Sequence, residues 1–374
     1  MAAPEAQQTP SPTVMRRYVL ESTDSLDGLV LEQDAKLPDI TSPTQIRIRI
    51  KAISLNARDI QIATGQYPPH SVPKGLVPVS DGCGVVESVG AQVTHFKVGD
   101  HVAPVFPQGH HWEEHLTLKS LRRGLGGGID GVAAEYFVCD EEEAVRIPSN
   151  FSYLEGATLP IAFGTAWSSL YGHQPKLQAG ETVLCLGTGG VSLCAAQLAL
   201  GAGARVILTS SSLDKLDKAE RLLRPLASPG APKNVIQTID YSLIKDWDEE
   251  VRRMTHGKGV DFVIEIGGRG TLGRSIRSTR AGGLVAVSGY MSVYKTIPRE
   301  ILEEDIAQTI LYSAANVRGV FCCNREMLKA CVSALEVGGA KPVVGKTFKF
   351  DQLCEAYKYL EAGKHMGKVC IELE

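Results

Sequence analysis

A short apolar run that ends in a cluster of glycines constrains the fold more than any other feature of the sequence. Residues 182–186 read Thr-Val-Leu-Cys-Leu, and Gly187, Gly189 and Gly190 follow before an apolar stretch with helical spacing. Glycine at 187 permits a tight turn, glycine at 189 lets the backbone approach a diphosphate, and the small Ser192 allows close packing of helix on strand. The pattern predicts a strand, a phosphate-binding turn and a helix whose N-terminus attracts an anion.

The segments around this loop alternate between strand and helix. A purely structural turn can use the same glycines, but the flanking elements favour a dinucleotide site at Gly187, Gly189, Gly190, Val191 and Ser192. Alternation of this kind is typical of a doubly wound parallel sheet that is covered on both faces. We expect further strands at 205–209, 260–265, 283–288 and 316–321, and helices at 191–200, 213–223 and 247–254.

The end of the second strand bears on the choice between NAD and NADP. An NAD site places Asp or Glu there to bind the ribose hydroxyls, whereas this chain has Thr209, Ser210, Ser211 and Ser212, followed by Lys215. Hydroxyls beside a cation suit a 2′-phosphate. Alternatively, Ser212 only caps the next helix and Lys215 is an ordinary exposed charge. Because the acidic residue is missing, the sequence favours NADPH.

The rest of the chain differs in character from this central part. Short alternating segments at 45–50, 84–89 and 135–138 indicate a β-rich domain. Amphipathic helices are expected near 325–336 and 350–360, packed back onto that domain. The start has three prolines and no apolar core, which is typical of a disordered leader and not of a targeting peptide. The predicted divisions are a leader (1–14), a β-rich domain (15–155), a dinucleotide domain (156–320) and a C-terminal return (321–374).

Composition excludes several classes of protein. A formal net charge of -3 offers no basic field for nucleic acid. Nine cysteines without a C-x-x-C pair indicate reduced thiols, so we expect a cytoplasmic protein. The stretch 182–204 has no charged residue and is long enough to span a bilayer, but its glycines and changing period indicate strand, loop and helix. We therefore expect neither a nucleic-acid partner nor a membrane span.

Taken together, these motifs resemble the medium-chain dehydrogenase/reductase superfamily, and most closely its zinc-lacking, quinone-oxidoreductase-like branch, whose members are often labelled alcohol dehydrogenases. The resemblance covers nearly the whole chain from Arg16 to Glu374. It implies a GroES-like catalytic domain interrupted by a Rossmann domain, an active site in the cleft between them, and a homodimer. Besides the glycine loop, the matching stretches are LNARD (55–59), PVSDGCG (78–84), FKVGD (96–100), ATLPIAFGTAW (157–167) and GKHMGKV (363–369).

Zinc-containing members of the superfamily differ from this chain where the metal binds. Asn56 stands in place of a catalytic cysteine, and Val79, Ser80 and Asp81 stand in place of a Gly-His-Glu run. Amides and hydroxyls are poor zinc ligands, and the lobe between Cys83 and Cys139 lacks the structural cysteines. The sequence therefore predicts no bound zinc.

One histidine cluster, in contrast, could bind a metal ion. His111 and His115 are four residues apart, a spacing that can grip a metal from one face of a helix, and His110 adjoins them. The alternatives are a solvent-exposed polar loop, or a loop whose His111 and Trp112 line the substrate cleft, as a Trp does in related proteins.

The resemblance also implies roles for individual residues. Asn56 would lie beside the nicotinamide and hold a developing oxyanion, unless it is a structural amide at a strand end. Tyr67 would face the substrate as a proton relay, or simply pack. Asp81 would pair with Arg58 and shape the floor of the site, or form with it a plain buried salt bridge that has no catalytic role. The positions that match cofactor contacts are Thr165, Tyr241, Gly267, Ser288, Gly289 and Lys368, each of which has an alternative as a turn or helix-end residue.

Three functions are consistent with these residues. The first is an NADPH-dependent, zinc-independent reductase of quinones or α,β-unsaturated ketones, because conjugate hydride addition needs little carbonyl activation. The second is an NADP-dependent alcohol dehydrogenase or ketone reductase. The third is an isomerase or binding protein that keeps the fold but transfers no hydride. All three imply a small-molecule carbonyl ligand, and none depends on a macromolecular partner other than a second copy.

Overall fold

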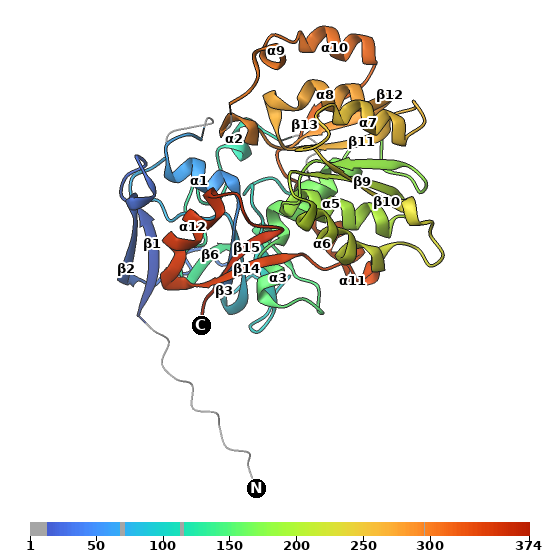
Figure 1. The fold of residues 1–374 in the computed structure, drawn as a ribbon. Helices are drawn as coiled ribbons and strands as arrows, with labels where there is room; N and C mark the ends of the chain where they lie inside the picture. The colour runs from blue at the N-terminus through green and yellow to red at the C-terminus, as the bar shows by residue number, and fades with distance from the viewer. Residues whose placement is uncertain (1–12, 68–71, 113–115, 295) are drawn as a thin grey trace.

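The computed structural model describes residues 13–67, 72–112, 116–294 and 296–374. The predicted leader therefore falls almost wholly outside the described residues. Two larger sheets organise the fold, and each belongs to one of two lobes that lie side by side in Figure 1. None of the described helices is long and apolar enough to cross a bilayer.

The first lobe is the predicted β-rich domain. In β3 (Gln45–Leu55), Ile46, Ile48 and Ile50 are fully buried while the arginines between them lie nearer the surface, as strict alternation requires. β1 (Val14–Leu20) and β2 (Leu29–Lys36) form a separate hairpin sheet. The main sheet has the order β14-β15-β3-β4-β5-β7 with β6 also on β3, where the other strands are β4 (Asp81–Val89), β5 (His101–Pro104), β6 (Tyr136–Asp140), β7 (Ala144–Arg146), β14 (Val344–Lys349) and β15 (Lys368–Glu372).

The second lobe is a six-stranded sheet in which every pairing is parallel. Its order, β10-β9-β8-β11-β12-β13, reverses direction between β8 and β11, which is where doubly wound sheets bind ligands. The strands are β8 (Thr182–Cys185), β9 (Arg205–Ser210), β10 (Ile236–Asp240), β11 (Val260–Glu265), β12 (Thr279–Val287) and β13 (Asn316–Gly319). Strand β10 was not predicted from the sequence.

Helices cover both faces of this sheet, as predicted. Val183 and Cys185 of β8 point into one apolar cluster and Leu184 into another, so the strand is buried on both sides. One cluster includes residues of α4 (Gly164–Tyr171), α5 (Gly190–Gly201), α6 (Leu213–Leu223) and α11 (Arg325–Gly338). The other includes residues of α7 (Trp247–Met254) and α8 (Leu272–Ser278).

The C-terminal segment returns to the first lobe. β15 pairs antiparallel with β3, and Val369 lies opposite Leu55. α12 (Leu353–Glu361) packs on α1 (Ala57–Ala63), while α11 packs on α4 and β7, between the lobes. Figure 1 shows the red C-terminal elements lying against the blue N-terminal ones. The second lobe is thus inserted into the first, and this connection places β15 beside the glycine loop.

Candidate active site

The glycine loop has the geometry that its sequence predicts. Gly187 has φ +76°, a left-handed conformation that favours glycine, and its N–H donates to Thr209 Oγ1 at 3.2 Å. Gly189 is the N-cap of α5. Ser192 is fully buried, and its hydroxyl donates to the Leu186 carbonyl at 2.5 Å, which ties the first turn of the helix to the strand end.

The room available for a side chain differs between Gly189 and Gly190 of this loop. A Cβ built on Gly189 meets no atom within 4 Å, whereas one on Gly190 comes within 2.5 Å of Lys368 Cδ. The backbone at Gly189 therefore faces an opening, and Lys368 lies directly against the next residue. Unpaired N–H groups at the start of α5 together with this opening fit the diphosphate of a dinucleotide.

A C-terminal segment, Gly363 to Lys368, crosses over the loop. Gly367 forms a parallel bridge with Gly189, and its N–H donates to the Thr188 carbonyl at 2.9 Å. From α6, Lys215 Nζ donates to the carbonyls of Gly363 at 3.3 Å and His365 at 2.9 Å. Lys215 is thus not an ordinary exposed charge, because it holds this segment over the loop.

The end of β9 carries the other residues predicted to bind NADP. Ser210 is buried, and its carbonyl accepts the N–H of Tyr241 at 2.9 Å, while Ser211 is exposed. Ser212 caps α6, because its hydroxyl accepts the N–H of Lys215 at 3.4 Å. This contact is the helix cap that was given above as the alternative to a cofactor contact. Neither Asp nor Glu occupies the end of β9.

A buried carboxylate that the sequence analysis overlooked shapes the loop after β11. Glu265 Oε1 accepts the N–H groups of Gly267 at 2.6 Å and Gly268 at 2.8 Å, and the Thr271 hydroxyl at 2.7 Å. Its other oxygen accepts the Ser275 hydroxyl. Burial raises the pKa of Glu265, and these hydrogen bonds oppose that effect. An acidic residue at the end of an apolar strand, followed by two glycines, is the signal that could have revealed it.

The ends of β12 and β13 line a large cavity. Ser288 and Gly289 lie on its wall with Tyr290, Phe321 and Cys323, and its volume is about 820 Å³. The Ser288 N–H donates to the Glu265 carbonyl at 2.8 Å, so this wall is held to the loop after β11. Thr165, by contrast, is buried on α4 and is not one of the residues that line the cavity.

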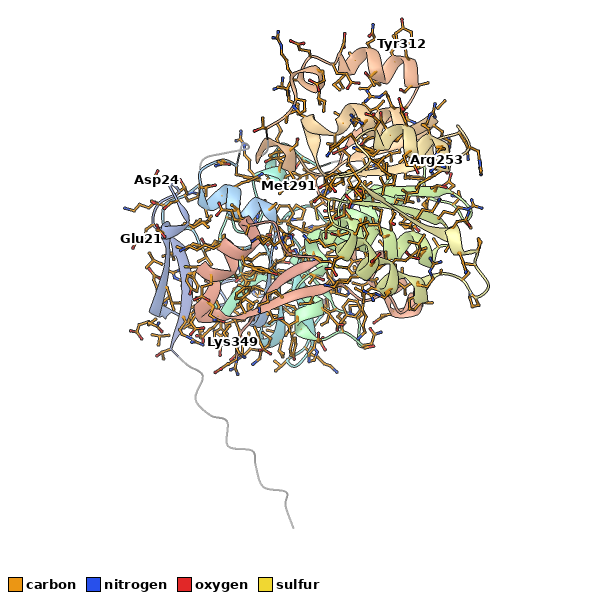
Figure 2. The ribbon with its side chains drawn as sticks, viewed as in Figure 1. Glu21, Asp24, Arg253, Met291, Tyr312 and Lys349 are labelled. Carbon is orange, nitrogen blue, oxygen red and sulfur yellow. The ribbon has the colours of Figure 1, made fainter. Side chains whose placement is uncertain are left out.

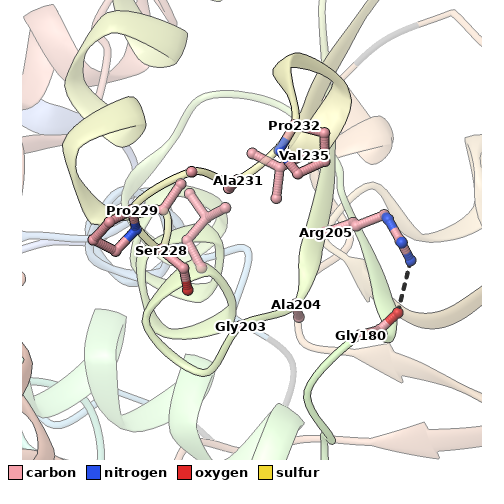
Figure 3. A pocket seen from close by; sticks show the side chains of 12 residues that line it. Gly180, Gly203, Ala204, Arg205, Ser228, Pro229, Ala231, Pro232 and Val235 are labelled. Carbon is pink, nitrogen blue, oxygen red and sulfur yellow. Dashed lines mark hydrogen bonds between the residues drawn. The ribbon is translucent and has the colours of Figure 1, made fainter.

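A smaller hollow lies at the amino ends of the strands of the same sheet. It has a volume of about 310 Å³ and lies near the start of β9, bounded by Gly180, Gly203, Arg205 and the loop from Ser228 to Val235 (Figure 3). In the view of Figure 3, the Arg205 guanidinium donates to the Gly180 carbonyl at 2.9 Å. Since parallel sheets bind ligands at the carboxyl ends of their strands, this hollow is not the candidate active site.

Asn56, Asp81 and Lys368 form a polar cluster where the two lobes meet, in which Asp81 and Lys368 are buried and Asn56 is half-buried. Lys368 Nζ donates to Asn56 Oδ1 at 2.5 Å and to the Leu55 carbonyl at 2.8 Å. Asn56 Nδ2 donates to Asp81 Oδ2 at 2.8 Å, and Lys368 Nζ lies 3.7 Å from the same oxygen. Burial raises the pKa of Asp81 to about 7, although Lys368 and Asn56 act against this rise. All three residues are site candidates from the sequence, but their mutual contact was not predicted.

The expected pairing of Arg58 with Asp81 is wrong. Arg58 Nη1 lies 3.4 Å from Asp59 Oδ1 and donates to the Leu125 carbonyl at 2.9 Å. Its guanidinium also stacks on Tyr67, at 5.0 Å from the ring centroid. Arg58 turns away because its immediate neighbour Asp59 offers a closer carboxylate, while Lys368 and Asn56 already serve Asp81. Tyr67 has a packing contact here, and its catalytic role stays a prediction.

The histidine cluster lies beside the start of α11. His111 Nε2 is 3.1 Å from Glu143 Oε1, and the His110 carbonyl accepts the N–H of Arg325 at 3.1 Å. His110 lines the large cavity, whereas Trp112 is exposed. His115 lies outside the described residues. Within the described chain, no group of three or more His, Cys, Asp or Glu side chains is arranged to hold a metal ion.

Comparison with known proteins agrees with this geometry. Residues 42–149 match the alcohol dehydrogenase GroES-like domain, and residues 190–337 match the zinc-binding dehydrogenase domain. The chain is 37% identical to a zinc-type alcohol dehydrogenase-like protein of Schizosaccharomyces pombe, over 96% of this chain and 99% of that one. It is 30% identical to the 2-methylene-furan-3-one reductase of Solanum lycopersicum, over 96% and 79%. A putative alcohol dehydrogenase from Sinorhizobium meliloti superposes with a TM-score of 0.82 at 33% identity, over 97% and 100%.

Proposed function

This chain belongs to the medium-chain dehydrogenase/reductase superfamily of oxidoreductases, and from that premise we propose that it is an NADPH-dependent, zinc-independent reductase of activated double bonds in quinones or α,β-unsaturated ketones. The observation that carries the proposal is the polar cluster of Asn56, Asp81 and Lys368, which offers hydrogen-bond donors where zinc enzymes of the superfamily bind their metal.

Conjugate reduction suits such a cluster. When bound, NADPH supplies a hydride to the electron-poor carbon, and negative charge develops on the substrate oxygen. Asn56 Nδ2 carries two N–H groups and Asp81 accepts one of them, and we assign the second to that oxygen. Lys368 holds the amide in place by donating to Asn56 Oδ1. The protein thereby stabilises the oxyanion with a preorganised amide and without a Lewis acid.

The donor set supports a zinc-independent site. Zinc prefers thiolate, imidazole or carboxylate ligands, and the amide of Asn56 and the hydroxyl of Ser80 are poor replacements. Of Asn56, Ser80 and Asp81, only Asp81 carries a carboxylate, and the ammonium group of Lys368, 3.7 Å away, partly offsets its charge. The relative from Schizosaccharomyces pombe is named a zinc-type protein, so the zinc content of this chain should be measured. One zinc per chain, with activity lost to chelators, would contradict the proposal.

The end of β9 supports NADPH over NADH. Ser210, Ser211 and Lys215 provide hydroxyls and a cation, and no carboxylate is present to bind a free 2′-hydroxyl. A 2′-phosphate would meet these groups without repulsion.

Alcohol dehydrogenase or ketone reductase activity is the second candidate, and the names of two relatives favour it. In contrast, the relative from Solanum lycopersicum is named as reductase of a compound whose methylene group is conjugated to a ketone. Both reactions consume NADPH, so the product distinguishes them. An enone substrate would give a saturated ketone by the first reaction and an allylic alcohol by the second.

The test is an NADPH-oxidation screen across quinones, enones, aldehydes and simple ketones, with NADH run in parallel. We expect turnover with quinones or enones, saturated products and a preference for NADPH. Turnover of simple ketones to alcohols would favour the second candidate. Tight NADPH binding without oxidation by any carbonyl compound would favour a non-redox role.

A further inference from the structure

His365 lies between two lysines that come from different parts of the fold. Its carbonyl accepts Lys215 Nζ of α6 at 2.9 Å, and Lys368 follows three residues later at the start of β15. The segment that carries His365 is fixed over the glycine loop by the bridge between Gly367 and Gly189. The backbone of His365 is therefore held over the glycine loop, two residues from this bridge.

The imidazole lacks a partner that would explain its position. His365 Nδ1 is buried and has no hydrogen-bond partner among the described residues. The charged groups that act on the ring are Lys215 from α6 and Lys368 from β15, while Lys364 of the same segment is exposed. Burial lowers the pKa of His365 to about 4, and both lysines add to the effect. Two fixed cations thus act on a neutral imidazole, and an anion bound beside the ring would offset their effect.

We propose that His365 binds a phosphate group of the dinucleotide and takes up a proton as it does so, so that cofactor binding is coupled to pH. This inference rests on the proposed NADPH site. A phosphate placed among the two lysines and the imidazole reverses the local potential, because its negative charge stabilises the imidazolium. The protonated ring then donates a charge-assisted hydrogen bond to the phosphate.

The sign of the coupling follows from linkage. Binding raises the pKa of His365, so cofactor affinity is greatest at low pH and falls as the pH rises through the value in the complex. The fall is at most about tenfold per pH unit for one proton. A 2′-phosphate titrates near pH ~6 and binds to cations best as the dianion, so its own contribution is proton release, which has the opposite sign.

Calorimetry of the full-length protein measures this proton directly. NADPH and NADH are titrated at about pH 7 in two buffers of different ionisation enthalpy, and the difference in heat gives the number of protons taken up. We expect wild-type protein to take up part of a proton per dinucleotide and His365→Gln to take up none. Lys364→Gln, which removes an exposed charge one residue away, is the matched control and should behave as wild type.

A second measurement covers the case in which His365→Gln does not fold. The imidazole resonances of the wild-type protein report the protonation of His365 with and without NADPH, and binding should convert the ring to imidazolium. If NADH causes the same uptake as NADPH, the partner is the diphosphate, and if only NADPH does, it is the 2′-phosphate. Binding with no uptake by wild-type protein, or with uptake retained in His365→Gln, overturns the inference alone. Failure of both dinucleotides to bind overturns the proposed function.

Discussion

Asp81 is fully buried, and its interactions explain both the strength of the central polar cluster and its cost. One carboxylate oxygen accepts from Asn56, while the other, Oδ1, has no hydrogen-bond partner among the described residues. An ammonium group at 3.7 Å only partly offsets the loss of hydration, so the pKa of Asp81 is raised to about 7. Stability is given up here to fix the position of Asn56 and Lys368.

This raised pKa predicts a pH-dependent stability. Between the ordinary Asp pKa and about pH 7, the folded protein holds a proton on Asp81 that the unfolded chain has lost, so stability falls as the pH rises through this window. The full effect is on the order of 4 kcal/mol. Denaturant unfolding at several pH values should therefore show Asp81→Asn gaining stability relative to wild type toward neutral pH. A constant difference between the two proteins across the window would contradict the assignment.

Asn56 should affect turnover more than cofactor binding. We expect Asn56→Ala to lower kcat for an enone by about 10²-fold, because the oxyanion loses a preorganised donor. The Kd for NADPH should change less than kcat, since the amide that is removed is assigned to the reacting oxygen and not to a phosphate group. Asn150→Ala, in an exposed loop, is the control. An equal loss in NADPH affinity and in kcat would instead indicate that Asn56 only supports the structure.

These residue contacts mark the limit of what the sequence predicts. Asn56, Asp81 and Lys368 were named because each lies in a motif, yet Asn56 and Lys368 are 312 positions apart and Asn56 and Asp81 are 25 apart. Arg58 was paired with the wrong carboxylate because adjacent Asp59 was not weighed as a competitor. Glu265 was missed because its role depends on a loop that folds back onto it.

At the scale of elements, helices and strands were predicted best where apolar residues recur with a clear helical or strand pattern. Helices α6 and α7 and strand β11 have the predicted bounds, since the two helices carry apolar residues at helical spacing and the strand is mostly apolar. β10 was missed because Gln237 and Thr238 interrupt a run of only five residues that follows a proline-rich loop. β10 is stabilised as a strand by its parallel pairing with β9, which is a tertiary interaction that the local sequence does not reveal.

The glycine loop permits a substitution that separates folding from binding. Gly189 has φ -78°, and a Cβ there meets no atom within 4 Å, so Gly189→Ala should fold and lose only the small difference between glycine and alanine as an N-cap. The added methyl group would occupy the space in front of α5, and NADPH affinity should fall by about tenfold or more. Gly201→Ala, at the other end of α5, also meets open space and should bind NADPH normally. Thermal unfolding and fluorescence titration of both variants test this, and unchanged NADPH affinity in Gly189→Ala would place the diphosphate elsewhere.

At the scale of the whole molecule, one domain is interrupted by another, and the site lies where the chain crosses between them. β3 supplies Leu55, β15 supplies Lys368 and the glycine loop supplies Gly189. Alternation of strand and helix predicted the inserted sheet, and the resemblance to a known family implied the return of the C-terminus. The packing of α11 on β7 agrees with its expected return to the β-rich domain, but its packing on α4 of the inserted domain was not predicted, because an amphipathic pattern does not say which apolar surface it will meet.

The remaining surface of the second lobe leads to an expected assembly. β13 is the last strand in the sheet order, and an unpaired edge strand offers its backbone N–H and C=O groups to another chain. Immediately before it, α10 (Ile306–Ser313) packs on α8 and leaves Leu311 and Tyr312 71% and 81% exposed. Figure 2 shows Tyr312 pointing outward from this helix. An apolar patch beside an open edge suits a two-fold contact between copies, so we expect a homodimer.

Light scattering coupled to size-exclusion chromatography checks this expectation. The wild-type protein should have the mass of two chains, and the double variant Leu311→Glu with Tyr312→Glu should shift toward one chain, because four charges would be buried across a two-fold contact. Val337→Glu changes an equally exposed residue, 91% accessible at the end of α11, and should stay dimeric. A monomeric wild type, or a double variant that stays dimeric, would show that the patch has another use. Since β12 and β13 also line the large cavity, whose wall includes the expected cofactor positions Ser288 and Gly289, loss of the dimer should weaken ligand binding there while leaving the dinucleotide contacts at β8 and β9 intact.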